Sequence, residues 1–428
     1  MRRIARRPDE LRAQTFGSPR TPITTGAQRP RVPSAAEPPS RHTKPLPAAV
    51  PKGAQMQAIV SPQEHIYLAV RPGAQAGMQL PSANYEELAV AATHGHPVPS
   101  WFADAARQAW QLDLAGHPTG SIVTVRPRST APVTYSRASW EINKGCNFAC
   151  EHCYLEQRPF AGLPLDEKLT VIDMLRDMGV LWFQITGGEP LIDPDFPPAY
   201  EHAHNAGMMV EILTNGSRLA RPEHIAMFTA RRPHKITVSM YGASPETADA
   251  LTRTRGAFKT MYRGLQAAAA ADLPVEVTII ITKHNVAELD NMRALIDELG
   301  FPRNEYGSIS PTYTGNGSPL EAQAPGYLDK SAIFAGCPAG HTSFHVDPHG
   351  FATMCKVGRD NPISLITEGP EGLTRLPAIA DAQMLRTGGC SGCTLSSTCR
   401  VCRPMARVYQ EAKAPLENYC QHGERTTS

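Results

Sequence analysis

The 428-residue sequence has no cysteine before residue 146 and none between residues 153 and 337. It also has no apolar run long enough to cross a bilayer, no internal repeat and no phosphate-binding loop. Basic residues nowhere alternate with aromatic ones in a patch. We therefore expect neither a membrane protein nor a nucleic-acid substrate. The ten cysteines are clustered with metal-like spacing, which argues against disulfides and secretion and predicts a cytoplasmic location.

The net charge of +2 is unevenly distributed along the chain. Residues 1–52 carry a net charge of +8 and ten prolines, which leaves about −6 for the remainder. This composition predicts a disordered Pro/Arg-rich tail over residues 1–54. The tail is either a basic segment that recruits an acidic partner, a linker, or an upstream extension if translation starts at Met56. No hydrophobic segment follows Arg2 and Arg3, so they do not indicate an export signal.

Three cysteines stand in one short segment, Cys146-Asn-Phe-Ala-Cys150-Glu-His-Cys153. Three thiolates from one loop leave one iron of a cubane [4Fe-4S] cluster without a protein ligand. Such an iron can bind and activate a small molecule, whereas a site with four protein ligands is closed. The alternatives to such a cluster are half of a zinc site, a ferredoxin-like motif and a set of buried core cysteines.

The C-x3-C-x2-C spacing resembles the signature of radical S-adenosylmethionine (radical SAM) enzymes. The resemblance implies that Cys146, Cys150 and Cys153 hold a catalytic [4Fe-4S] cluster whose open iron binds the amine and carboxylate of SAM. In that family an electron from the cluster cleaves SAM to a 5′-deoxyadenosyl radical, which abstracts hydrogen from the substrate. His152, inside the motif, is included among the cofactor-binding residues that the resemblance implies.

A second motif follows the cysteine loop. Residues 139–143 alternate as a strand, residues 166–178 place apolar side chains on one helical face, and residues 180–185 are apolar enough for a buried strand. This strand ends in Gly187-Gly188-Glu189-Pro190. Glycines allow close backbone approach to a ligand, and the carboxylate of Glu189 can accept charge-assisted hydrogen bonds from an ammonium group. The segment resembles the GGEP motif that holds the amino group of SAM in the same family.

Strands continue to alternate with helices. We expect further strands at 209–213, 235–241, 275–282 and 306–311, and helices at 197–206, 222–230, 258–271 and 286–299. Such alternation predicts a parallel sheet with right-handed crossovers. Six units resemble the partial (β/α)6 TIM-type barrel of the radical SAM core, here placed at residues 136–325, with the chemistry at the carboxyl ends of the strands. Ser239 resembles a polar residue that contacts SAM in that family; alternatively, it is a surface serine on a strand. Arg253 is a candidate partner for the SAM carboxylate; alternatively, it is a solvated helix residue.

Seven more cysteines lie in the last third of the chain: Cys337, Cys355, Cys390, Cys393, Cys399, Cys402 and Cys420. Their layout resembles the SPASM domain, an extension with two auxiliary [4Fe-4S] clusters, which we place at residues 330–425. Only two residues separate Cys399 from Cys402, where the family pattern usually has three. A zinc ribbon is the alternative, because C-x2-C pairs also suit tetrahedral zinc.

The resemblance implies two ligand sets for this extension. Cys337, Cys355 and Cys402 would hold the first auxiliary cluster. The second would be fully ligated, by Cys390, Cys393, Cys399 and Cys420. The first set lacks a fourth thiolate, since Ser343 occupies the position where some relatives have cysteine. His341 or His345 is a candidate replacement, or that iron is open to substrate.

Residues 55–130 form a predicted small α+β unit. Strands are expected at 57–60, 66–70 and 121–125, with helices at 85–93 and 100–114. Peptide-modifying relatives often carry an N-terminal module that binds the leader of a precursor peptide by strand addition. This unit is either a small version of that module or a cap that packs on the barrel.

The resemblance implies a peptide or protein substrate. Lys356 follows Cys355 where sulfatase-maturing relatives carry an aspartate base. If all ten cysteines are cluster ligands, none is spare to return a hydrogen atom. Net oxidation that crosslinks a ribosomally made peptide is the first hypothesis, with an external electron donor as a further partner. A small-molecule substrate (a sugar, a tetrapyrrole or an antibiotic scaffold) and a non-catalytic iron–sulfur or zinc protein are the alternatives. Tyr241, Tyr313, His345 and Asp347 are candidate bases by location.

Overall fold

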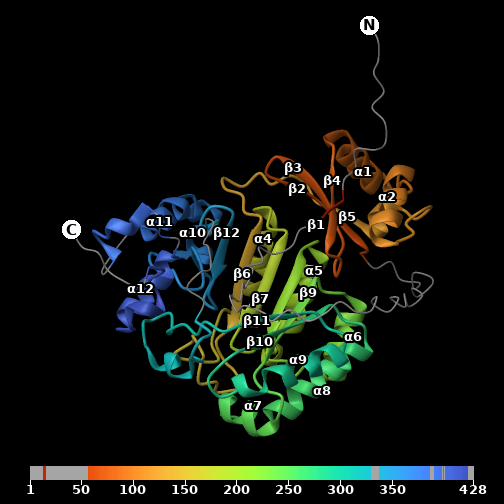
Figure 1. Ribbon diagram of the computed structural model, residues 1–428. Coiled ribbons are helices and arrows are strands. Elements are labelled where there is room, and N and C mark those ends of the chain that lie inside the picture. Colours follow the sequence, from red (N-terminus) through yellow and green to blue (C-terminus); the bar gives the residue numbers. More distant parts are fainter. Residues whose placement is uncertain are drawn as a thin grey trace, which may run out of the picture.

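A computed structural model describes residues 13–15, 56–328, 337–385, 390–397, 399 and 401–422. Figure 1 shows an N-terminal unit in orange, a central unit of strands and helices from yellow to teal, and a C-terminal region in blue. Within the described ranges, no helix combines the length and the apolar character needed to cross a membrane.

The N-terminal unit is a five-stranded sheet with helices on it. Its strands are β1 (Ala13–Thr15), β2 (Ala58–Gln63), β3 (Ile66–Val70), β4 (Ala76–Leu80) and β5 (Val123–Val125), in the order β1-β4-β3-β2-β5. Its helices are α1 (Ser82–His94), α2 (Ser100–Trp110) and α3 (Thr119–Ile122). Leu88, Phe102 and Trp110 pack in its core. Strand β1 pairs with β4 in antiparallel register, Ala13 opposite Met78.

Six parallel strands form the central unit, and they neighbour one another in chain order. They are β6 (Arg137–Asn143), β7 (Trp182–Gly187), β8 (Met209–Thr214), β9 (Lys235–Met240), β10 (Val275–Ile280) and β11 (Arg303–Tyr306). The helices between them are α4 (Leu165–Asp177), α5 (Phe196–Asn205), α6 (Pro222–Ala230), α7 (Pro245–Thr252), α8 (Ala257–Ala270) and α9 (Leu289–Glu298). The sheet is open, since its order runs from β11 to β6 without closing among the described residues. This confirms the expected partial (β/α)6 barrel.

The two faces of this sheet differ in polarity. Trp140, Phe183 and Ile212 are fully buried in the core cluster that includes residues of the surrounding helices. Glu141 and Glu211, displaced by one residue on the same strands, are also buried but face the other side, because successive side chains of a strand alternate. The inner face of the partial barrel therefore carries charge, which a solely structural interior would avoid.

The C-terminal region extends the same sheet. Its strands are β12 (Ser343–Val346), β13 (Phe351–Thr353) and β14 (Ile363–Ser364), and β12 pairs with β6 in parallel. Its helices are α10 (Leu365–Gly372), α11 (Leu376–Gln383) and α12 (Arg403–Glu411). Short 3-10 helices at Pro190–Ile192, Val286–Glu288, Ser318–Ala322, Leu373–Arg375, Thr394–Ser397 and Leu416–Asn418 complete the described elements. The C-terminal region thus lies beside the first barrel strand (Figure 1).

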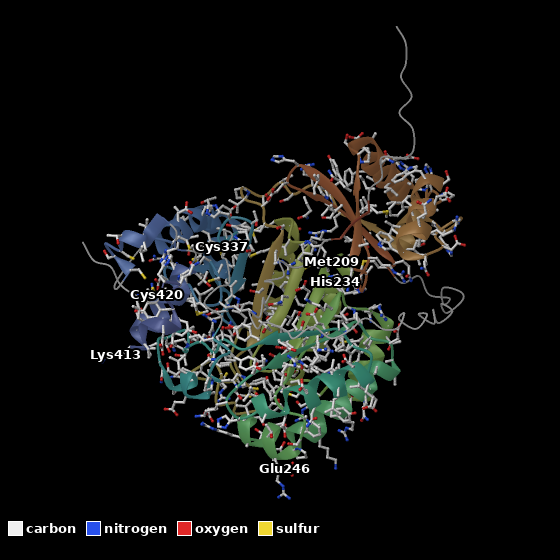
Figure 2. All side chains as sticks on the ribbon, in the orientation of Figure 1. Met209, His234, Glu246, Cys337, Lys413 and Cys420 are labelled. Carbon is white, nitrogen blue, oxygen red and sulfur yellow. The ribbon has the colours of Figure 1, made fainter. Side chains whose placement is uncertain are left out.

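The N-terminal unit packs at the amino ends of the barrel strands. Ile59 and Leu68 form a buried cluster with Leu181 and Met209, which precede β7 and begin β8. The buried guanidinium of Arg126 donates to the carbonyl oxygen of Val180 at 2.8 Å. Figure 2 shows Met209 on the side of the barrel that faces this unit. The unit therefore covers the end of the barrel opposite the strands' carboxyl ends.

Several elements differ from the sequence expectation. The sixth strand is Arg303–Tyr306 rather than 306–311: the strand stops before Gly307, and Pro311 has no N–H to offer a ladder. Strand β4 was not expected, because glycines break its alternating pattern. Helix α7 was also not expected; it is short and begins with Pro245 after the capping residue Ser244.

A buried histidine on α5 predicts acid sensitivity of the fold. Burial lowers the pKa of His204 to about 4, and Arg231 adds to this effect. Because the unfolded chain binds this proton more readily, stability falls as pH falls from about 6.5 to 4. The His204 contribution is about 2 kcal/mol between pH 7 and pH 5. Denaturant titrations should show a flatter pH slope for His204→Gln than for the exposed-site control His65→Gln; equal slopes would contradict this assignment.

Candidate functional site

The cysteine motif forms a loop directly after β6, and α7 anchors it. Ala149 N donates to Thr252 O at 2.9 Å and Glu151 N donates to Leu251 O at 3.1 Å. On another side, Tyr313 N donates to Tyr154 O at 3.1 Å. These backbone bonds give the loop a defined place at the carboxyl end of the sheet.

The glycine pair after β7 packs against the same loop. Gly188 N donates to Asn143 O at 3.1 Å, and Glu189 N donates to Gly145 O at 2.9 Å. A Cβ atom on Gly187 would lie 2.1 Å from Asn143 O, and one on Gly188 would lie 2.1 Å from Gly145 O. The glycines are thus required for close approach to the cysteine loop itself, a partner that the sequence motif did not reveal.

Glu189 is fully buried beneath this contact. Its Oε1 accepts from Thr214 Oγ1 at 2.6 Å and from Leu191 N at 3.0 Å, and its Oε2 accepts from Asn215 N at 2.6 Å. Burial raises the pKa of Glu189 to about 7 against the lowering effect of these three hydrogen bonds. A carboxylate has about four acceptor sites, so Glu189 retains capacity for one more donor, such as an ammonium group.

Asn215 links Glu189 to the cysteines. Its side-chain amide donates to Asn147 Oδ1 at 3.1 Å and lies 3.8 Å from Cys146 Sγ. The Sγ of Cys146 also accepts from Phe148 N at 3.4 Å. The structure therefore brings together Cys146, Asn215 and Glu189, from three separate strand ends.

The three motif thiols lie close enough to affect one another's titration. Burial raises the pKa of Cys146 to about 11 and that of Cys150 to about 12, and in each case nearby thiols add to the rise. Burial also raises the pKa of Cys153. Metal binding deprotonates thiols, so a cationic cluster would offset this cost. The donor set fits a [4Fe-4S] group.

No three His, Cys, Asp or Glu side chains among the described residues converge on one point as ligands of a single metal ion would. Cluster ligation does not require such convergence, because each thiolate binds a different iron of the cubane.

The other predicted SAM-binding residues lie around the loop. The His152 ring is 5.3 Å from the Tyr241 ring, between centroids, and its buried Nδ1 has no hydrogen-bond partner among the described residues. Burial lowers the pKa of His152 to about 4. Ser239 stands on β9 and interacts with the side chain of Tyr241. Arg253, which caps α7, instead has its Nη2 3.5 Å from Glu151 Oε2, in an ion pair in which only the arginine is exposed.

Several of the C-terminal cysteines have defined neighbours in the structure. Cys337, Cys355 and Cys402 are close enough that Cys337 and Cys355 both raise the pKa of Cys402, which burial brings to about 11. The Sγ of Cys390 accepts from Gln410 Nε2 at 3.2 Å. Cys390 also packs against a cluster that contains Tyr409 and Tyr419, and Tyr419 immediately precedes Cys420 in the sequence. Cys393 and Cys399 lie in the same C-terminal region. Figure 2 marks Cys337 and Cys420 there.

Two histidines considered as cluster ligands have other partners. His341 Nε2 lies 2.8 Å from Asp381 Oδ1 at the surface. His345 is buried in the barrel, with Nδ1 2.9 Å from Ser139 Oγ. Asp347 accepts from the backbone of His349 and Phe351 in the β12–β13 turn.

A buried polar network inside the barrel was not predicted. Glu141 is fully buried, and its carboxylate accepts from Arg359 Nη2 at 2.7 Å, Arg359 Nη1 at 3.1 Å and Tyr154 Oη at 2.9 Å. Lys356 Nζ donates to Gln184 Oε1 at 2.9 Å in the same interior. The available signal for this network was Glu141 itself, an acidic residue in the middle of a predicted strand. Such a residue is rarely buried without a partner.

The Radical SAM superfamily profile matches residues 140–299. Over 183 residues, 42% of this chain and 52% of the relative, the sequence is 31% identical to an AdoMet-dependent heme synthase from Methanosarcina barkeri. Over 167 residues, 38% of this chain and 44% of the relative, it is 36% identical to a mycofactocin maturase, MftC, from Mycobacterium ulcerans. The chain thus spans about half the length of these curated relatives.

The fold is similar to that of Streptococcus suis SuiB, solved bound to S-adenosylmethionine. The TM-score is 0.53 at 13% identity, over 85% of this chain and 98% of SuiB. The profile match and this fold agree with the parallel sheet and the cysteine loop. We therefore assign residues 140–299 to the Radical SAM superfamily.

Proposed function

We propose that this protein cleaves SAM reductively and uses the resulting radical to oxidise a ribosomally made peptide, forming a crosslink or a related modification. The observation that carries the proposal is the packing of Gly188 and Glu189 on the cysteine loop, with Asn215 between Glu189 and Cys146. This packing places a cluster-binding loop beside a carboxylate with one free acceptor site.

The residues have distinct roles in this proposal. Cys146, Cys150 and Cys153 hold the [4Fe-4S] cluster, which together with SAM supplies a 5′-deoxyadenosyl radical. Glu189 accepts from the amino group of SAM, while Gly187 and Gly188 hold that segment against the loop. Ser239 and His152 line the same end of the sheet. Arg253 and the SAM carboxylate remain a weaker pairing, because Arg253 faces Glu151.

The seven C-terminal cysteines are proposed as ligands of two auxiliary [4Fe-4S] clusters. The proximity of Cys337, Cys355 and Cys402 supports the first ligand set. These clusters would accept the electron left after hydrogen abstraction and proton loss from the peptide, and an external donor would supply the electron for SAM cleavage. The proposed division is a tail (1–54), of which Ala13–Thr15 pairs with β4, an N-terminal unit (55–130), a radical SAM core (136–325) and an auxiliary-cluster region (330–425).

The N-terminal unit is the proposed peptide-recognition part. Strand β1 is the edge strand next to β4. Without β1, strand β4 would form the edge of the sheet, and its backbone groups could pair with another chain. Its pairing with Ala13–Thr15 supports the idea that this edge accepts an extended, antiparallel segment. A maturase among the relatives is consistent with a peptide substrate.

The test uses the anaerobically reconstituted protein, a reductant, SAM and, as candidate substrates, any short peptide encoded beside the gene and an iron porphyrin. We expect 5′-deoxyadenosine together with a peptide lighter by two hydrogen atoms. The second candidate is a tetrapyrrole substrate, favoured by the similarity to a heme synthase. Oxidation of an iron porphyrin with an unchanged peptide would replace the first proposal by the second. Zinc in place of iron, with no SAM cleavage, would contradict both.

A further inference from the structure

One buried carboxylate connects the two cysteine-bearing parts of the protein. Glu141 stands on β6, five residues before Cys146, and has no exposed surface. Arg359, four residues after Cys355, donates to both of its oxygens, at 2.7 and 3.1 Å. Tyr154, which follows Cys153, donates its hydroxyl to Oε1 at 2.9 Å. Glu141 thus bonds to residues next to both cysteine sites.

Tyr313 completes a ring of contacts around this ion pair. The guanidinium carbon of Arg359 lies 4.1 Å from the centroid of the Tyr313 ring. Lys144 Nζ, just before the cysteine loop, donates to the Tyr313 hydroxyl at 3.2 Å. The backbone of Tyr313 bonds to Tyr154 at 3.1 Å. The start and the end of the cysteine loop are therefore both tied to the residue on which Arg359 stacks.

Further contacts fix Arg359 itself. Its Nε donates to Lys356 O at 2.8 Å, which holds the turn after Cys355. Burial alone would raise the pKa of Glu141, but His345 and Arg359 hold it well below its usual range, so the carboxylate is charged. His345 Nε2 is 3.5 Å from Glu141 Oε1, too far for a strong hydrogen bond, which leaves Arg359 as the closest charged partner.

A buried ion pair of this kind is a weak source of stability, because desolvation offsets most of the attraction. Its geometric effect is stronger: a bidentate arginine fixes both distance and plane. The loop from Cys355 to Arg359 could be held at the barrel by apolar packing alone. The contacts instead converge on the cysteine loop. They therefore fix the position of the two loops relative to each other.

We propose that Glu141, Arg359 and Tyr313 are positioning residues that hold the Cys355–Arg359 loop against the radical SAM cysteine loop. This rests on the proposed function in one respect: an electron would pass between these two sites. The three residues need not touch substrate. Their role is to keep the two cysteine sites in one fixed arrangement, since small displacements of reacting groups lower rates strongly.

The first test measures amide hydrogen exchange of the reconstituted protein without SAM. In Arg359→Ala, exchange should rise at least about tenfold in residues 355–360 and also in residues 146–158, because an unpaired buried Glu141 loosens both loops. The matched control is Asp360→Asn, which breaks the half-exposed Asp360–Arg407 ion pair one residue along. The control should alter only its own segment. An Arg359→Ala effect confined to residues 355–360 would overturn the proposal.

The second test separates positioning from a general loss of structure. Arg359→Lys keeps the charge but not the bidentate geometry, so it should fold and cleave SAM in the absence of peptide. It should yield several times more 5′-deoxyadenosine per modified peptide than the unchanged protein, and Arg359→Ala more still. An unchanged ratio in Arg359→Lys, together with unchanged exchange, would overturn the positioning role. If the unchanged protein cleaves no SAM, the proposed function fails, while the exchange test still decides the coupling of the loops.

If Arg359→Ala does not fold, Tyr313→Leu serves in its place. This change removes the ring between Arg359 and Lys144 without leaving a buried charge unpaired. The exchange of residues 146–158 should again rise together with that of residues 355–360. A rise in only one of the two segments would contradict the coupling.

Discussion

Replacing Cys150 with alanine is expected to abolish reductive SAM cleavage while iron bound by the C-terminal cysteines is retained. Cys150 is the central cysteine of the loop, and its thiol interacts with those of Cys146 and Cys153. Two thiolates leave two irons of the cubane without protein ligands, which loses the cluster or its reactivity. Iron should fall from about 12 to about 8 per chain, and 5′-deoxyadenosine should fall to the level without enzyme.

Cys420→Ala is the matched control for this experiment. It removes one thiol from the C-terminal region, where Figure 2 labels Cys420. This variant should bind less iron but still cleave SAM in the absence of peptide. Cleavage retained by Cys150→Ala would remove Cys150 from the cluster site, and loss of all iron in that variant would show that the sites do not load independently.

Replacing Gly188 with alanine is expected to displace the cysteine loop. The added methyl carbon would lie 2.1 Å from Gly145 O and 2.4 Å from Lys144 O, both backbone atoms that no rotamer change can move. Relief requires the loop or the Glu189 segment to shift, at a cost of about 3 kcal/mol, the upper part of the range for overpacking. We expect a lower free energy of unfolding, little SAM cleavage and less iron.

Gly300→Ala controls for the loss of a glycine as such. Its φ is +74°, so alanine is strained there, but the methyl group meets nothing within 4 Å. The expected cost is about 1–2 kcal/mol with SAM cleavage unchanged. Denaturant titrations and 5′-deoxyadenosine assays compare the two variants. Equal effects on stability and cleavage would mean that the Gly188 contact is not what places the loop.

The sequence predicted most of the barrel because its signals are local. Strand alternation, helical faces and the Gly187-Gly188-Glu189 segment each lie within a few neighbouring residues, so strands β6 to β10 were found. The sixth strand was misplaced by a few residues, because its pairing with β10 ends at Tyr306 and this register cannot be read from the local sequence. Helix α7 was missed for the opposite reason, since eight residues with one buried face give little periodicity.

The parts that were not predicted depend on long-range pairing. The contact between Glu141 and Arg359 joins residues 218 positions apart, and nothing near either residue indicates the other. The same holds for β12, which pairs with β6 and so makes the C-terminal region a continuation of the barrel sheet. The glycine motif was found, but its contact with Asn143 and Gly145 required the register of β6 against β7.

The N-terminal unit lies at the amino ends of the strands, and the cysteine loop lies at their carboxyl ends. A peptide bound at β4, as proposed, would therefore have to extend over the length of the strands before one of its residues meets the loop. One six-residue strand such as Met209–Thr214 spans about 20 Å. An extended chain needs at least about six residues to cover that length. Under the proposed peptide recognition, the modified residue would lie at least this many residues away from the segment paired with β4.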